Sequence, residues 1–265
     1  MAPPERAAPP ARFDRPNPVA FLLYVLAAAF LIVSIQNVGL SVERLANGLP
    51  GIGRLLERMF PPDVDRLGAV GAALLETFQM AVVGTALGIV LSLPLAVLAA
   101  RGLSPHPAVY GLTRALISLF RTVPDLVWAL VFVIAVGLGP AAGTLAIMID
   151  TIGFCGRFFA ESMEETDRGP REALTALGAS RTGTVFSAVI PLAMPSFINT
   201  ALFSLEKSTR SSVVLGLVGA GGIGLELKVA MDLFQYDLAA TIIIAIFVLV
   251  LLVEQASTRL RARIL

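Results

Sequence analysis

Residues that support metal and redox chemistry are almost absent from this sequence. Its 265 residues include one cysteine, Cys155, and one histidine, His106. One cysteine cannot form a disulfide within the chain, and one histidine cannot build a His-rich metal site. We therefore expect no zinc site, no thiol redox chemistry and no bound cofactor.

Charged residues are also scarce, at 15% of the chain, whereas hydrophobic residues make up 56% and the mean hydropathy is +0.83. A typical soluble domain has about 25% charged and about 45–50% apolar residues. Too little polar surface remains to cover a core of this size, which excludes a soluble globular enzyme. The formal net charge of +1 gives no support for nucleic-acid binding. The composition predicts an all-α polytopic transmembrane helical bundle.

Long uncharged segments predict about six membrane spans, since a span needs about 20 mainly apolar residues. The first is expected to be an uncleaved span, because it is longer than most signal-peptide cores; a cleaved signal is the alternative. Pro94 should kink the second span, and Pro191 and Pro195 should break the fifth. Arg121 and Asp125 lie near the start of the third. The expected spans are residues 19–35, 77–100, 116–136, 141–159, 186–205 and 238–253.

Composition divides the chain into four parts. Residues 1–17 are rich in proline and alanine and are expected to form a disordered tail. Residues 18–73 hold the first span and a mixed-charge loop, 36–73, expected on the outer side of the membrane. Residues 74–258 form the main transmembrane domain, with a polar loop at about 161–185. Residues 259–265 form a basic C-terminus.

The distribution of lysine and arginine predicts the orientation of the chain. Six spans place both termini on the same side of the membrane. With the N-terminus inside, the inner segments hold 13 of the 20 Lys and Arg residues and the outer segments hold 7. The positive-inside rule therefore favours both termini in the cytoplasm.

The polar loop after the fourth span predicts a two-turn helix. Gly169 is expected as its N-cap, Pro170 as its first residue and Gly178 as its stop. Glu172 would lie in the first turn, where a negative charge suits the helix dipole. Such a helix is too short to be stable alone and must dock, either on the membrane surface or on a cytoplasmic partner. Its expected apolar stripe is Ala173, Leu174, Ala176 and Leu177.

This loop resembles the motif of binding-protein-dependent ABC importer permeases, which reads Glu-Ala-Ala, three residues, Gly, nine residues, Ile-x-Leu-Pro. The sequence keeps Glu172, Ala173, Gly178 and Pro191 at the motif spacing. It departs from the motif with apolar exchanges at three positions, Leu174, Ala188 and Ile190. The resemblance implies that Glu172, Ala173, Leu174, Gly178 and Pro191 belong to the surface that couples the permease to its ATPase.

Two further stretches are similar to the phosphonate-importer permease family. They are the polar sequence around Asp150–Glu172 and the sequence from Glu206 to Gly224. The resemblance implies a bacterial inner-membrane subunit that pairs with a second copy of itself. It also implies a cytoplasmic ABC ATPase and a periplasmic substrate-binding protein as partners. The solute would be a phosphonate or a related oxyanion such as phosphite.

A glycine-rich stretch lies between the last two spans. Gly219, Gly221 and Gly224 spell G-x-G-x-x-G, but the strand and the acidic residue of a dinucleotide site are missing. With Gly222, these glycines instead predict close packing in a partial helix or a re-entrant segment. The N–H groups at the start of such a helix are also candidates to contact an anionic solute.

Four charged residues fall within or beside the predicted spans: Asp150, Arg157, Glu206 and Arg210. Glu206 and Arg210 are four residues apart, so they share one face of a helix. Asp150 and Arg157 are seven residues apart and also share one face. Such charges are costly in a membrane and usually face protein or a pathway. They are either packing ion pairs or pathway residues, and our hypothesis is that Arg210 lines the translocation route.

Two other function classes are weaker. An ion-coupled secondary transporter would use Asp150 and Glu206 as ion sites, but we find no repeat between the two halves of the chain. An intramembrane protease has neither G-x-S-x-G nor H-E-x-x-H to support it. The chain also lacks a P-loop, so ATP hydrolysis is expected in a separate subunit. We therefore expect a transport subunit and not an enzyme, with no catalytic residues.

Overall fold

The computed structural model describes residues 17–39 and 41–264, and the regular elements within these ranges are helices. This confirms the all-α prediction. The chain forms two compact units, Met1–Glu57 and Arg58–Leu265. The predicted disordered tail lies, apart from Asn17, outside the described residues.

The first unit begins with α1 (Pro18–Val38), which is capped by the Asn17 side chain and ends at Gly39. This helix of 21 mostly apolar residues is long enough to cross a membrane. The helix α2 (Val42–Met59) follows, so the prediction that residues 36–73 form a loop is wrong. Its apolar residues recur every three or four positions, which outweighs the mixed charge and the internal Pro50. They are Val42, Leu45, Leu49, Ile52 and Leu56.

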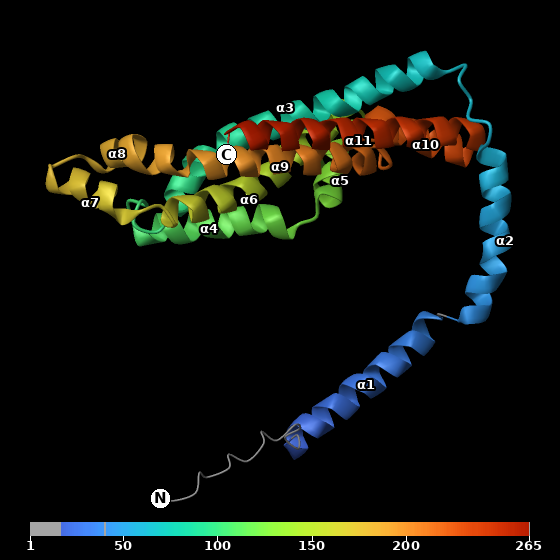
Figure 1. The fold of residues 1–265 in the computed structure, drawn as a ribbon, viewed down its shortest axis with the longest axis horizontal. Coiled ribbons are helices and arrows are strands. Elements are labelled where there is room, and N and C mark those ends of the chain that lie inside the picture. The colour runs from blue at the N-terminus through green and yellow to red at the C-terminus, as the bar shows by residue number, and fades with distance from the viewer. Residues whose placement is uncertain (1–16, 40, 265) are drawn as a thin grey trace, which may run out of the picture. The chain divides into compact units, whose positions relative to one another are not determined.

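The second unit is a bundle of long helices that pack along one another (Figure 1). Helices α7 and α8 project beyond one end of the bundle, and α10 lies at the opposite end. The elements are α3 (Leu67–Ala99), α4 (Pro107–Thr122), α5 (Asp125–Val136), α6 (Pro140–Glu164), α7 (Arg168–Ala176), α8 (Arg181–Thr184), a π-helical turn (Val185–Val189), α9 (Ile190–Gly216), α10 (Gly222–Asp232) and α11 (Tyr236–Ile264).

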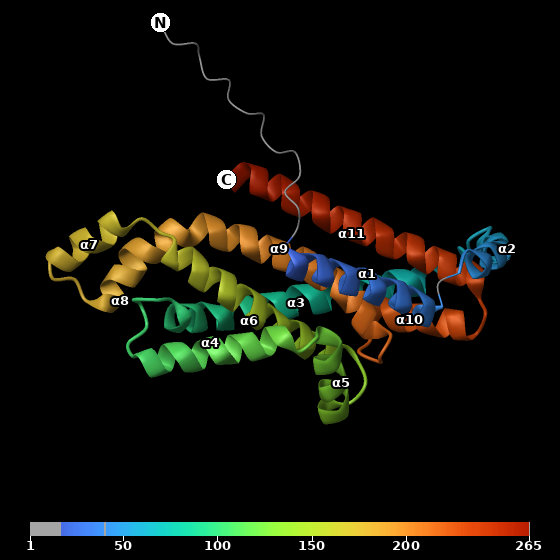
Figure 2. The same cartoon turned by 90° about the horizontal axis from the view of Figure 1, so that it is seen from below.

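In the part of the chain that the structure describes, five helices are long and apolar enough to cross a membrane, and the pair α4 and α5 adds a sixth if it is counted as one span. This agrees with the six predicted spans. The third, however, is not a continuous helix over residues 116–136. The pair is bent by 90° at Val123 and Pro124, and α5 turns away from the bundle (Figure 2). The ring of a proline disfavours the helical conformation at the residue before it, and Val123 accordingly has an extended backbone.

The predicted break of the fifth span at Pro191 and Pro195 is wrong. The helix runs from Arg181 to Gly216, and both prolines lie within it. A π-helical turn over Val185–Val189 directly precedes Pro191. This wider turn accommodates a residue that has no N–H to donate.

An apolar cluster joins α3, α6 and α9 near the end that carries α7. Phe159 and Met163 of α6 are fully buried there, and the Phe159 and Phe197 rings lie 4.5 Å apart between centroids. Burial of such side chains contributes about 1.5–3 kcal/mol each. This core holds the ends of α3 and α6 together and positions the polar groups that contact α7.

Candidate functional site

The projecting helix α7 begins at Arg168, two residues before the predicted start at Pro170. Its N-cap is Asp167, whose side chain accepts a hydrogen bond of 3.1 Å from the Gly169 N–H. The prediction of Gly169 as the N-cap is therefore wrong, because a carboxylate can satisfy a free N–H and glycine cannot. Glu172 is consequently the fifth residue of the helix and lies beyond its first turn.

The predicted stop at Gly178 is confirmed. Its φ of +82° is left-handed, a conformation that glycine adopts without steric cost. The Gly178 N–H donates to the Thr175 carbonyl, and the Ala179 N–H donates to the Leu174 carbonyl, each at 3.0 Å. These bonds satisfy carbonyls that the end of the helix would otherwise leave free.

One face of α7 rests on the turn between α3 and α4. Arg171 Nη2 donates to the Gly102 carbonyl oxygen at 2.5 Å, and Leu174 is half-buried. Much of the remaining surface of α7 is open, and Leu177 at its C-terminal end is 84% exposed. The exposed residues of the predicted coupling surface are Glu172, Ala173, Gly178 and Pro191.

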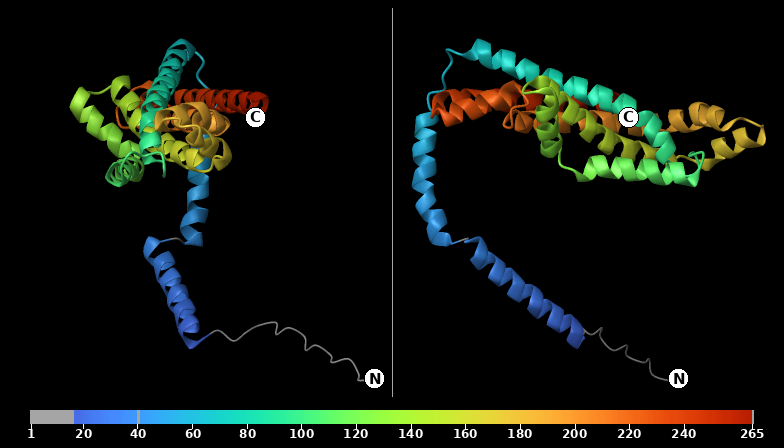
Figure 3. Two further views of the ribbon diagram at one scale, coloured as in Figure 1. Left: turned by 90° about the vertical axis from the view of Figure 1, so that its left-hand side faces the viewer. Right: turned by 180° about the vertical axis from the view of Figure 1, so that it is seen from behind.

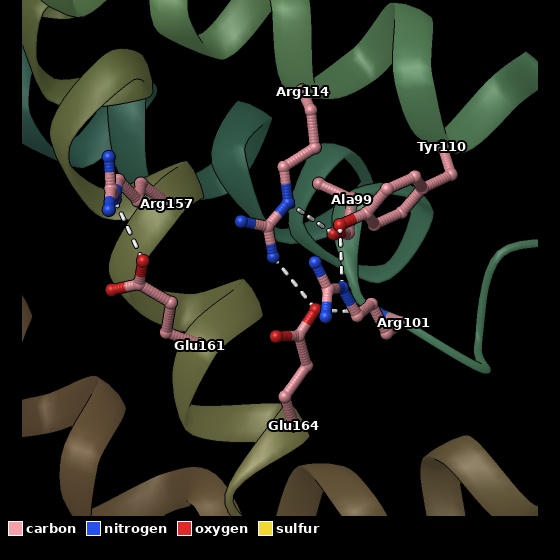
Figure 4. Close-up of polar contacts among 7 residues, drawn as sticks. All are labelled: Ala99, Arg101, Tyr110, Arg114, Arg157, Glu161 and Glu164. Atoms are coloured by element: carbon pink, nitrogen blue, oxygen red, sulfur yellow. Dashed lines mark hydrogen bonds and ion pairs between the residues drawn. The ribbon is translucent and has the colours of Figure 1, made fainter.

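Glu164, at the end of α6, connects three elements beside α7 (Figure 4). Its Oε1 accepts a hydrogen bond from the Arg101 backbone N–H at 2.6 Å and from Arg114 Nη2 at 2.7 Å. Arg114 also donates from Nε to the Ala99 carbonyl at 2.9 Å. The end of α3, the helix α4 and the end of α6 are thereby linked.

The same network extends to Tyr110 of α4. Arg101 Nε donates to the Tyr110 hydroxyl at 3.0 Å, and the Arg114 guanidinium lies over the Tyr110 ring at 5.3 Å from its centroid. The hydrogen bond to Tyr110 raises the pKa of the exposed Arg101 guanidinium above its ordinary value. Glu164, Arg114 and Tyr110 were not predicted as site residues. The partners of Glu164 are 63 and 50 residues away, whereas the four-residue spacing of Tyr110 and Arg114 was a local signal.

Asp150 and Arg157 have separate partners in the structure. The Asp150 carboxylate accepts two hydrogen bonds of 2.8 Å from Lys207 Nζ of α9, which also lies over the Phe154 ring. Arg157 Nε pairs with Glu161 at 2.8 Å (Figure 4). Lys207 was missed because the fifth span was predicted to end at residue 205.

The predicted pair of Glu206 and Arg210 is present, with a closest approach of 3.9 Å. Glu206 also forms an ion pair with Arg261 of α11, and its side chain is only 9% exposed. Arg261 belongs to the segment 259–265 that was expected to be a separate basic terminus. The structure instead continues α11 to Ile264, and Arg261 on this helix reaches the buried carboxylate of Glu206.

The glycine-rich stretch forms a tight turn and then the 11-residue helix α10, which confirms the predicted partial helix. Its first N–H groups are occupied: Gly222 donates to Glu76 Oε1 at 2.8 Å, and Ile223 donates to Thr77 Oγ1 at 2.7 Å. Gly219 and Gly221 have positive φ. A Cβ atom at Gly224 would overlap the Val213 carbonyl, so this glycine permits the contact between α9 and α10.

Arg121 and Asp125 flank the bend between α4 and α5. Arg121 lies in the last turn of α4, and Asp125 begins α5, where its Oδ1 accepts a hydrogen bond of 2.9 Å from the Leu126 N–H. Among residues 17–39 and 41–264, no group of three or more His, Cys, Asp and Glu side chains has an arrangement suited to a metal ion.

Comparisons with known proteins give consistent results. Residues 92–265 match the family "Binding-protein-dependent transport system inner membrane component". The chain is 42% identical over 238 residues to the phosphate-import permease protein PhnE of Mycolicibacterium smegmatis, covering 89% of this chain but only 44% of that protein. It is 40% identical over 222 residues to the phosphite transport system permease protein PtxC of Stutzerimonas stutzeri, covering 84% of this chain and 81% of that one.

A solved structure shares the fold. An inward-facing MetNI methionine ABC transporter superposes with a TM-score of 0.68 at 24% sequence identity, covering 77% of this chain and 99% of that chain. At this identity the likeness concerns the fold alone.

Proposed function

This chain belongs to the binding-protein-dependent transport system inner membrane component family, and we propose that it is the permease subunit of an ATP-driven importer of phosphorus oxyanions. It is a multi-pass membrane protein. The observation that carries the proposal is the exposed helix α7, which projects from the bundle and rests on the turn between α3 and α4. A short helix with an open outer face is suited to receive a separate protein.

In this proposal α7 docks on a cytoplasmic ATPase. Glu172, Ala173, Leu177 and Gly178 lie on its exposed surface and would contact that subunit. A displacement of α7 would reach α3 and α4 through Arg171 and Gly102. It would reach α6 because Glu164 accepts from Arg101 in the same turn.

The solute and the remaining partners follow from the relatives. One of them is named for phosphate import and another for phosphite transport. Phosphate and phosphite are both tetrahedral phosphorus oxyanions. A second copy of this chain would complete the pathway, and a periplasmic binding protein would deliver the solute. Transport would run from docking of that protein, through ATP-driven closure of the ATPases, to release after hydrolysis. The α7 end of the bundle and both termini would face the cytoplasm.

The charged residues in the spans divide into two groups under this proposal. Asp150 pairs with Lys207 of α9, and Glu206 pairs with Arg261 of α11. Both act as ion pairs that hold the packed helices together. Arg157 and Arg210 keep side chains that are about half exposed and are the pathway candidates. Gly219, Gly221, Gly222 and Gly224 serve the close packing of α10.

Purification of the tagged full-length chain from its native membrane, followed by mass spectrometry, tests the proposal. We expect an ABC ATPase at near-equal stoichiometry. A preparation free of any ATPase that still moved methylphosphonate into vesicles along an ion gradient would contradict it and favour a secondary transporter.

A further inference from the structure

A cavity of about 610 Å³ lies between α4 and α6, and three arginines line it: Arg114, Arg121 and Arg157. Arg114 and Arg121 are seven residues apart on α4 and therefore share one face of that helix. Figure 3 shows α4 running alongside α6, with α5 turned away beyond it. The remaining lining residues are small or neutral: Ala99, Ala115, Ile117, Ser118, Thr122 and Ala160.

Close packing on α6 determines where Arg121 lies. A Cβ atom at Gly153 would be only 2.9 Å from the Arg121 backbone nitrogen and 3.0 Å from the Phe120 carbonyl carbon. The last turn of α4 therefore rests directly on α6. This contact holds the Arg121 backbone beside α6, while Arg157 reaches the same cavity one turn further along that helix.

The charge of this arginine cavity is not fully compensated. Glu164 pairs with Arg114 through Nη2, and Glu161 pairs with Arg157 through Nε, so each glutamate neutralises one arginine. Among the ion pairs of the described residues, none includes Arg121. No acidic side chain lines the cavity itself. It therefore carries a net positive charge, and the ion pairs constrain the orientation of the Arg114 and Arg157 guanidinium groups.

We propose that the arginine cavity binds a phosphorus oxyanion group, with Arg121 as the principal ligand and Arg114 and Arg157 as additional donors. A guanidinium offers planar paired N–H donors that match a phosphate-type anion, and such bonds are stronger than neutral ones. The Ser118 and Thr122 hydroxyls can donate as well. A volume of about 610 Å³ is ample for a small solute.

Two sources supply this chemistry: the transported solute and the headgroup of an anionic phospholipid. The solute source rests on the proposed function, whereas the lipid source does not. Arg114 lines the cavity and also pairs with Glu164. A bound anion would therefore contact the group of polar contacts around Glu164 beside α7.

Calorimetric titration of the full-length chain, in complex with its ATPase, tests the proposal. One arm adds methylphosphonate to protein in phosphatidylcholine nanodiscs, and the other uses native mass spectrometry to count phosphatidylglycerol retained from mixed nanodiscs. We expect Arg121→Gln to weaken binding of the occupant about tenfold or more, as for loss of a charge-assisted hydrogen bond. Arg259→Gln, which alters an exposed arginine of α11 that does not line the cavity, should leave binding within about twofold of wild type.

The two arms assign the source. Loss of methylphosphonate binding in Arg121→Gln identifies the solute, and loss of phosphatidylglycerol alone identifies the lipid. Binding of neither probe, or equal binding by Arg121→Gln and Arg259→Gln, overturns the proposal. If Arg121→Gln does not fold, Arg157→Gln is measured with the same expectation.

Uptake separates this proposal from the proposed function. Wild-type protein that drives ATP-dependent methylphosphonate uptake but shows no Arg121-dependent binding overturns the site alone. Wild-type protein that fails to transport under these conditions, yet retains phosphatidylglycerol through Arg121, overturns the proposed function alone.

Discussion

Arg171 of α7 donates a hydrogen bond of 2.5 Å to the carbonyl oxygen of Gly102, a residue 69 positions earlier in the turn between α3 and α4. Glu164 of α6 accepts from the next residue back, Arg101. The short helix and the ends of three longer helices are therefore connected through one turn. This connection explains how a helix of nine residues would transmit a displacement to the bundle.

Replacing Arg171 with alanine should separate ATP hydrolysis from transport. The variant loses the hydrogen bond to Gly102, worth about 1 kcal/mol after allowance for solvent exposure. We expect the amount of solute imported per ATP hydrolysed to fall about fivefold, while hydrolysis itself continues. Proteoliposomes that report both quantities make the measurement, with Arg259→Ala as the matched control. An unchanged ratio for Arg171→Ala would show that this contact does not transmit the displacement.

Gly178→Ala should loosen the end of α7. A left-handed conformation costs a residue with a Cβ atom about 1 kcal/mol, and no neighbouring atom lies within 4 Å of the new carbon. The effect is therefore confined to the backbone. We expect faster amide hydrogen exchange at residues 174–179. Gly111→Ala, where α4 also has open space, should leave exchange in this region unchanged. Equal protection in both variants would argue against the role of Gly178 as the helix stop.

Glu164→Gln should lower the thermal stability of the bundle. The substitution removes the negative charge that pairs with Arg114, and both side chains are at most 30% exposed. We expect a loss of about 1 kcal/mol, which corresponds to a few degrees in Tm. The control is the neighbouring Glu165→Gln, since Glu165 is exposed. A Tm for Glu164→Gln that matches this control would refute the structural role of the ion pair.

Gly224→Ala should be among the most damaging single substitutions. Its Cβ atom would overlap the Val213 carbonyl, a backbone atom that moves only if α9 and α10 separate. We expect a cost of about 1–3 kcal/mol or more, with a reduced yield of monodisperse protein. Gly68→Ala adds a methyl group into open space at the start of α3 and should be tolerated. Size-exclusion profiles in mild detergent distinguish the two outcomes.

Local patterns in the sequence predicted several features correctly. Uncharged runs indicated the spans, Gly178 indicated the end of α7, and four-residue spacing indicated the pair of Glu206 and Arg210. Each of these depends on residues close together in the chain. The helix α2 was also available to such reasoning, from the three- and four-residue spacing of its apolar side chains, but the count of charges obscured it.

Most of the remaining features depend on contacts that no local pattern encodes. Glu76 accepts from Gly222 across 146 residues, Lys207 reaches Asp150 across 57, and Glu164 reaches Arg114 across 50. The bend at Pro124 had a local signal in the proline itself, but the continuous hydrophobicity of the segment favoured a straight span. The arginine cavity likewise draws its lining from α3, α4 and α6, and the packing of α4 on α6 at Gly153 and Gly156 brings its side chains together.

The most direct test of the account is uptake of methylphosphonate into proteoliposomes that contain this chain, its ATPase and its binding protein. The account predicts uptake that requires ATP and the binding protein and that continues when ion gradients are collapsed. Uptake that persists without the ATPase and stops when the ion gradient is removed would contradict it.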